Sequence, residues 1–152
     1  MNDSHLTCRL RQAMVAATPE EKVRQRLIAY MIDHLGFLPH TLLIEKELRQ
    51  LPHIDPALSQ MPQRRFDLLV LEADIHPQFP LYPLLVIECK AVKIKAKERR
   101  QLEGYNHYLR APFICLVNDE EILTGQYHFD LGRYHFENGL PVRKVLLDSF
   151  TQ

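Results

Sequence analysis

Two nearly continuous apolar runs constrain the fold of this chain more than any other feature. They are residues 66–71 (Phe-Asp-Leu-Leu-Val-Leu) and residues 84–90 (Leu-Leu-Val-Ile-Glu-Cys-Lys). Runs of this kind are typical of central strands that are covered on both faces of a sheet. The link between them contains Pro77, Pro80 and Pro83, which excludes a helix there. We therefore expect an α/β protein with these two strands in the middle of its sheet.

The segments around the two runs predict helices and further strands in the order αβββαβ. Thr18 and Pro19 form a helix start, and apolar residues at three- and four-residue spacing extend that helix over about residues 19–35, where Gly36 stops it. The other expected elements are a strand at 42–48, an irregular connection at 52–62, a helix at 95–109 and a strand at 113–117. Alternating patterns within residues 122–147 predict short strands near an edge. The expected architecture is a mixed central sheet flanked by helices, with extra C-terminal strands.

The composition is that of one folded domain without a membrane segment. The chain has 152 residues, of which 46% are hydrophobic and 25% charged, so a single domain over residues 1–152 is expected, with its core at about 18–120 and a strand extension at 121–152. The formal net charge is +0, so a DNA site would have to be a local patch. The three cysteines are far apart, and no apolar stretch could cross a bilayer. A cytoplasmic location with no membrane partner is expected.

Three charged residues lie in or directly after the two apolar runs. Charged groups are rarely buried unless they are paired or bind a metal. Asp67 interrupts the first run, and Glu88 and Lys90 end the second on the same side of the strand, because side chains alternate. Two carboxylates from neighbouring strands suit Mg²⁺, with Mn²⁺ as a substitute. The expected metal site contains Asp67, Glu88 and Cys89, with water, a backbone carbonyl and a substrate phosphate oxygen as further ligands.

Asp67 followed by Glu88-Cys89-Lys90 resembles the D…ExK signature of the PD-(D/E)XK nuclease superfamily. Other segments resemble the N-terminal endonuclease domain of type I restriction enzyme R subunits and its short stand-alone relatives. They are the opening helix at 19–25, the metal strand at 65–70, Gln101 with Tyr105 and Asn106 after the ExK motif, and the strand at 112–118. The resemblance covers roughly residues 18–120.

This resemblance implies a restriction-endonuclease-like core that hydrolyses DNA phosphodiesters with Mg²⁺. Asp67 and Glu88 would be metal ligands and Lys90 the catalytic lysine. A Glu of the first helix, either Glu21 or Glu20, would supply a further carboxylate. We prefer Glu21 because on a helical wheel it shares a face with Arg24, Gln25 and Ile28. The second helix would line the site with one side chain. The expected catalytic residues are Glu21, Asp67, Glu88, Lys90 and Gln101.

Basic residues flank the expected site on both sides. They are Lys93, Lys95, Lys97, Arg99 and Arg100 after the second run, and Arg64 and Arg65 before Asp67. They could contact backbone phosphates, although a solvated helix start explains the first group equally well. DNA is the expected partner. A second copy of the chain, or a restriction or repair subunit, is a further expected partner because cutting both strands normally requires two active sites.

Two other interpretations stay open at the level of sequence. A Glu and a Lys at a strand end often form a solvated ion pair worth under about 1 kcal/mol. The chain could then be a catalytically silent nuclease-fold module that binds DNA or a partner protein, which the neutral net charge favours. It could also be a purely structural or assembly subunit.

Overall fold

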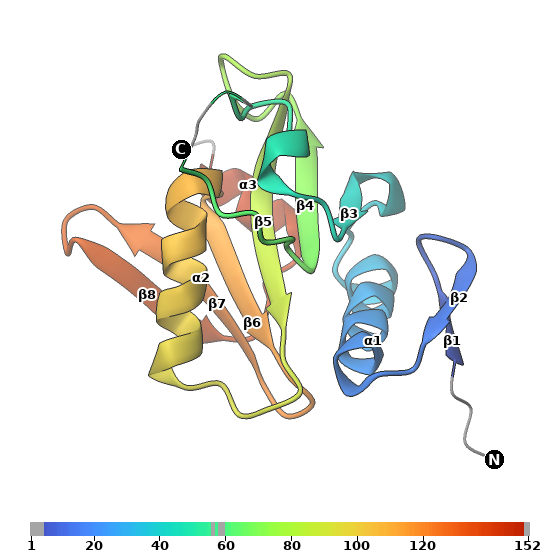
Figure 1. The fold of residues 1–152 in the computed structure, drawn as a ribbon. Helices are drawn as coiled ribbons and strands as arrows, with labels where there is room; N and C mark the ends of the chain where they lie inside the picture. Colours follow the sequence, from blue (N-terminus) through green and yellow to red (C-terminus); the bar gives the residue numbers. More distant parts are fainter. Residues whose placement is uncertain (1–4, 56, 58–59, 151–152) are drawn as a thin grey trace.

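A six-stranded mixed sheet forms the centre of the computed structural model, which describes residues 5–55, 57 and 60–150 (Figure 1). The strands are β3 (Leu42–Ile44), β4 (Leu68–Ala73), β5 (Leu81–Cys89), β6 (Phe113–Val117), β7 (Ile122–His128) and β8 (Arg133–Asn138), and they lie side by side in that order. Strands β5 and β6 are parallel and the other neighbours are antiparallel. A parallel pair requires a crossover, and helix α2 (Ala96–Leu109) provides it.

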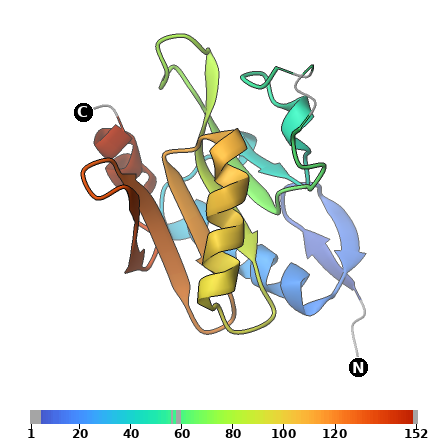
Figure 2. The same ribbon diagram turned by 60° about the vertical axis from the view of Figure 1, so that its left-hand side comes forward.

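Helices cover both faces of the sheet. Helix α1 (Pro19–His34) and helix α3 (Arg143–Phe150) pack on one face, while α2 packs on the other (Figures 1 and 2). A hairpin of β1 (His5–Cys8) and β2 (Ala13–Ala16) lies outside α1. Two 3-10 helices, η1 (Pro39–Thr41) and η2 (Leu48–Gln50), flank β3. Within the described residues, no helix has the length and apolarity needed to span a membrane.

The central strands are buried as their apolar sequences predict. Residues 82–89 of β5 are all buried, and so is every residue of β6. Alternate side chains of these strands enter two hydrophobic cores, one beneath α1 and α3 and the other beneath α2. The expectation of an α/β fold with a mixed central sheet and added C-terminal strands is therefore confirmed.

The boundaries of three elements differ from the expectation. The strand expected at 42–48 ends at Ile44, because Glu45 adopts a positive φ of 52° that turns the chain. The patterns within residues 122–147 predicted only short strands, and β7 and β8 are such strands, but α3 begins at Arg143 and buries Leu146 against the core. The β1–β2 hairpin was not predicted. The irregular connection expected at 52–62 lies partly outside the described residues.

Candidate functional site

The pairing of β4 with β5 brings Asp67 opposite Glu88. Leu68 pairs with Ile87 in this antiparallel ladder, so the residues just beyond that pair face each other at the same end. An Asp67 carboxylate oxygen accepts a hydrogen bond of 2.7 Å from the backbone N–H of Cys89. The structure thus gathers the Asp and the Glu-x-Lys segment at one point, at the carboxyl end of β5.

The end of β5 is held in place by its parallel neighbour. The backbone N–H of Lys90 donates to the carbonyl of Val117 at 2.8 Å, and the Lys90 ammonium nitrogen lies 3.5 Å from a carboxylate oxygen of Glu88. The Lys90 side chain therefore lies on the same side of the strand as Glu88, as the alternation of side chains along a strand predicts.

Glu88 is buried, but its charge is compensated. Its side chain is paired with the guanidinium of Arg64 as well as with Lys90. The Arg64 guanidinium lies 6.0 Å from the centre of the Tyr105 ring, and the Tyr105 hydroxyl donates to the Arg64 carbonyl at 3.4 Å. Removing a carboxylate from water costs several kcal/mol unless partners replace the water. Arg64 and Lys90 are those partners in this structure.

Asp67 lines a small polar cavity of about 80 Å³, which Glu88, Arg64 and Lys90 do not line. The cavity is bounded by the start of α1, by the chain after β3 and by the end of β5; its residues are Thr18, Glu20, Glu21, Arg24, Glu45, Asp67 and Cys89. The Thr18 hydroxyl accepts from the Glu21 N–H at 3.2 Å, which is the N-cap that the Thr-Pro start of the helix predicts. This cap fixes where α1 begins and so sets the position of Glu21 at the cavity.

Arg24 lies between the carboxylates of this cavity. It forms ion pairs with Glu21 and Glu45, and it donates to the backbone carbonyl of Asp67 at 3.4 Å. Glu21 is only 5% exposed, and both of its carboxylate oxygens are engaged: Oε1 accepts from the Gln25 side chain at 3.3 Å, and Oε2 is paired with the Arg24 guanidinium. These partners offset the cost of burying the carboxylate.

The ionisation of Asp67 is disfavoured by its surroundings. Burial, and after it the charge of Glu88, raise the pKa of the Asp67 carboxyl to about 6, against the lowering effects of the Cys89 N–H and Arg24. A carboxylate with a raised pKa in a cavity is a common property of functional sites. A bound cation would reverse the effect, because positive charge favours the ionised form.

The residues present fit a Mg²⁺ ion held by few protein ligands. No group of three His, Cys, Asp or Glu side chains in the described part of the chain is arranged to hold a metal. Mg²⁺, however, keeps several waters and often takes only one or two carboxylates, which Asp67 and Glu88 could supply. The Cys89 thiol is an unsuitable ligand for Mg²⁺, because this ion takes oxygen ligands. Cys89 could contribute only its backbone carbonyl.

Gln101 lies away from this cavity. It is exposed on α2, whereas Leu102 and Tyr105 of the same helix face the sheet. The α2 side chain that reaches the site is Tyr105, through Arg64. Arg24 and Glu45 were not predicted as part of the site, although Arg24 follows Glu21 by three residues on the same helical face.

Of the predicted basic residues, Arg64 is paired with Glu88, and none of the set lines the cavity beside Asp67. Four of them are exposed on the approach to α2 or in its first turns, namely Lys93, Lys95, Lys97 and Arg100. The Arg99 guanidinium instead lies 5.7 Å from the centre of the Phe136 ring. Arg65 is exposed, with a nitrogen 3.9 Å from a Glu47 carboxylate oxygen.

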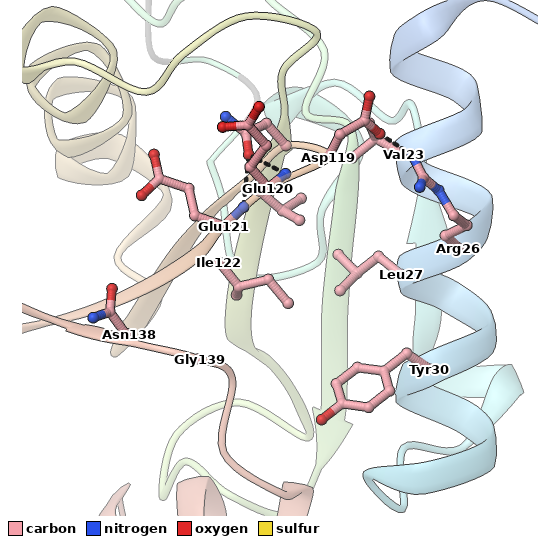
Figure 3. A pocket seen from close by; sticks show the side chains of 12 residues that line it. Val23, Arg26, Leu27, Tyr30, Asp119, Glu120, Glu121, Ile122, Asn138 and Gly139 are labelled. Atoms are coloured by element: carbon pink, nitrogen blue, oxygen red, sulfur yellow. Dashed lines mark hydrogen bonds and ion pairs between the residues drawn. The ribbon is translucent and has the colours of Figure 1, made fainter.

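A larger groove of about 630 Å³ lies between α1 and the turn after β6 (Figure 3). Its apolar floor includes Leu27 and Ile122, and its rim carries Asp119, which is paired with Arg26. No residue of the predicted catalytic set lines it. This groove and the predicted site are therefore separate features.

Comparison with known proteins gives one match. A family model described as type I restriction enzyme R protein N terminus matches residues 19–141, which include β3 to β8, α1 and α2. Neither the curated proteins nor the solved structures contain a match to the chain. Since the matched region covers most of the sequence, the chain belongs to the family of type I restriction enzyme R protein N termini.

Proposed function

We propose that this protein is a metal-dependent nuclease of the PD-(D/E)XK type that hydrolyses DNA phosphodiester bonds. The observation that carries the proposal is the placement of Asp67 opposite Glu88, with the Lys90 ammonium 3.5 Å from Glu88, at the end of two buried strands. Membership in a restriction enzyme family supports the same activity. The raised pKa of Asp67 in a cavity supports it as well, because perturbed carboxyls of this kind gather at functional sites.

Asp67 and Glu88 would hold a Mg²⁺ ion, or Mn²⁺ in its place. When bound, the ion would polarise a phosphoryl oxygen and favour ionisation of a water molecule. Lys90 is positioned to orient that water and to stabilise negative charge on the phosphate. Glu21 lines the same cavity as Asp67 and is paired with Arg24, and it would be a further carboxylate of the site.

Arg64 has a different role in this proposal. Its side chain is 41% exposed, so it can move from Glu88 toward solvent when a metal takes up the carboxylate charge. A guanidinium is well suited to hold a phosphate group. Arg64 would then bind the phosphate backbone beside the metal.

The test is cleavage of supercoiled plasmid, linear duplex and branched DNA by the purified protein in Mg²⁺ and in Mn²⁺. Asp67→Ala, Glu88→Ala and Lys90→Ala are each expected to abolish cleavage while the circular dichroism spectrum stays that of the wild type. Glu120→Ala is the matched control, because Glu120 is an exposed carboxylate in the turn after β6. Full activity of Glu88→Ala would refute the proposal.

A second candidate function is DNA or partner binding without turnover. The compensation of Glu88 by Arg64 and Lys90 favours it, because the carboxylate is already neutralised without a metal. This function predicts DNA affinity that neither EDTA nor Asp67→Ala changes, together with no cleavage of any of the three substrates. Metal-dependent products from the wild type alone would rule it out.

A further inference from the structure

The β7–β8 hairpin carries a continuous row of rings that starts at α2. The Arg99 guanidinium lies 5.7 Å from the centre of the Phe136 ring, and the Phe136 and Tyr134 ring centres are 6.2 Å apart. Tyr134 lies 5.3 Å from Tyr127, which lies 5.1 Å from Phe129. We call these five side chains the aromatic row.

The inner end of the aromatic row is anchored in the fold. Tyr134 and Phe136 pack against the core beneath α2, and the Asn106 side chain donates to the Tyr134 hydroxyl at 2.9 Å. Gly125 lies under the Phe136 ring, where a Cβ would come within 2.7 Å of a ring carbon. The rings therefore have fixed positions rather than forming a loose surface cluster.

The outer end of the row is open to solvent. The hairpin extends past α2, so Tyr127 is 39% exposed and Phe129 is 89% exposed (Figures 1 and 2). A phenylalanine ring with this exposure contributes little to the stability of the fold. Exposed apolar groups that join into a patch commonly mark a binding surface.

Positive charge gathers at the α2 end of the row. Lys97 and Arg100 are exposed on either side of Arg99, and all three lie near the helix N-terminus, whose dipole also favours anions. Lys90 of the candidate site also lies close to this helix end, because its charge helps to lower the pKa of Glu98 in the first turn of α2. Opposing charges near the row are Glu98 in the first turn of α2, Glu103 in the next turn, which acts on Tyr134, and the exposed Asp130 and Glu137 beside Phe129 and Phe136. Phosphates would thus be favoured at the start of α2, with bases directed along the hairpin.

We infer that the aromatic row binds single-stranded DNA, with bases stacked on Tyr127 and Phe129 and the backbone held at Arg99. The inference rests on the proposed nuclease function and extends it by naming the form of the substrate. Bases in a duplex are stacked on one another and present no free face, whereas unpaired bases stack on aromatic side chains without regard to sequence. The basic first turns of α2 connect this surface with Lys90 at the candidate site.

The test is fluorescence anisotropy of a labelled oligo(dT) of about 20 nucleotides, longer than the usual site of a single-strand binding surface. EDTA is present, so that binding is measured without cleavage. Phe129→Ala is expected to weaken binding about tenfold, in line with the loss of one stacked base. Phe129→Leu should weaken it similarly, because leucine keeps the apolar area but has no ring.

Leu131→Ala is the matched control, since Leu131 is 58% exposed at the same hairpin tip and has no ring. It should bind oligo(dT) like the wild type, and the affinity for a duplex of equal length should not respond to Phe129→Ala. Equal affinity of Phe129→Leu and wild type would overturn stacking. A wild-type dimer in analytical ultracentrifugation that Phe129→Ala makes monomeric would show an interface between subunits and would also overturn the inference.

These results separate failure of the inference from failure of the proposed function. If Phe129→Ala loses oligo(dT) affinity while the wild type cuts no DNA, the aromatic row binds single strands and the nuclease proposal fails. If the wild type cuts and Glu88→Ala does not, while Phe129→Ala binds oligo(dT) normally, the nuclease proposal holds and the inference fails.

Discussion

Asp67→Asn should make the metal-free protein more stable at neutral and alkaline pH. In the folded chain, burial and the charge of Glu88 raise the pKa of Asp67 from 3.8 to about 6. A tenfold change in a proton equilibrium is worth about 1.4 kcal/mol, so this rise corresponds to about 3 kcal/mol. Asparagine is neutral and keeps a side-chain oxygen for the Cys89 N–H. The substitution therefore removes the cost of an ionised carboxyl and retains its hydrogen bond.

The sign follows from proton linkage. Between pH 3.8 and about 6 the folded state binds a proton at Asp67 that the unfolded state has lost, so wild-type stability from this group falls as pH rises through that window. Below pH 3.8 both states are protonated and the substitution should change little. The gain from Asp67→Asn should thus grow across the window and reach at most about 3 kcal/mol near pH 8.

The assay is urea unfolding followed by circular dichroism, with EDTA, at a series of pH values for both proteins. If the same gain is followed by thermal unfolding, it corresponds for a chain of this length to a rise in Tm of roughly 6–12 °C. Glu88→Gln is the matched control, because it removes the partner of Arg64 and Lys90 and should lower stability by about 1–2 kcal/mol at pH 8. An Asp67→Asn variant that is no more stable than wild type at pH 8, or whose gain is the same at every pH, would refute the reasoning.

Two further predictions concern the frame that holds the site. Glu72→Ala should lower the free energy of unfolding by about 2–4 kcal/mol in urea titrations. Glu72 is 4% exposed and pairs with the half-buried Arg143 at 2.7 Å, so its loss leaves Arg143 without this partner. A change below about 0.5 kcal/mol would show that solvent replaces the pair. Gly125→Ala should lower it by about 1–3 kcal/mol, because the new Cβ would lie 2.7 Å from the Phe136 ring, and unchanged stability would mean that the ring can move aside at no cost.

The parts of the fold that depend on local sequence were predicted well. Nearly continuous apolar runs identify β4, β5 and β6, since strands buried on both faces show little polar alternation. The Thr18 cap and the stop at Gly36, which adopts a positive φ, define α1 closely. The facing of Asp67 and Glu88 could also be expected, because it needs only the pairing of consecutive strands.

The rest depends on contacts that no local pattern encodes. Arg64 reaches Glu88 only because of the path of an irregular segment, and the turn at Glu45 comes from a positive φ that its residue type does not announce. Helix α3 has only eight residues, so its apolar periodicity is too short to outweigh the strand-like pattern before it. Gln101 was assigned to the site by resemblance alone. It is exposed because α2 packs on the sheet through the face that carries Tyr105.

The irregular register in the β4–β5 pair has a consequence for how this chain can change in length. The shift lies between Val70 and Leu71, so the part of the ladder from Val70 down to Asp67 is regular and leads directly to the site. Adding or deleting one residue within it would turn the Asp67 side chain to the opposite face of the sheet. The connection at 74–80 lies beyond the shift, at the far end of the hairpin from the site. Insertions and deletions can accumulate in that connection while Asp67 and Glu88 stay face to face.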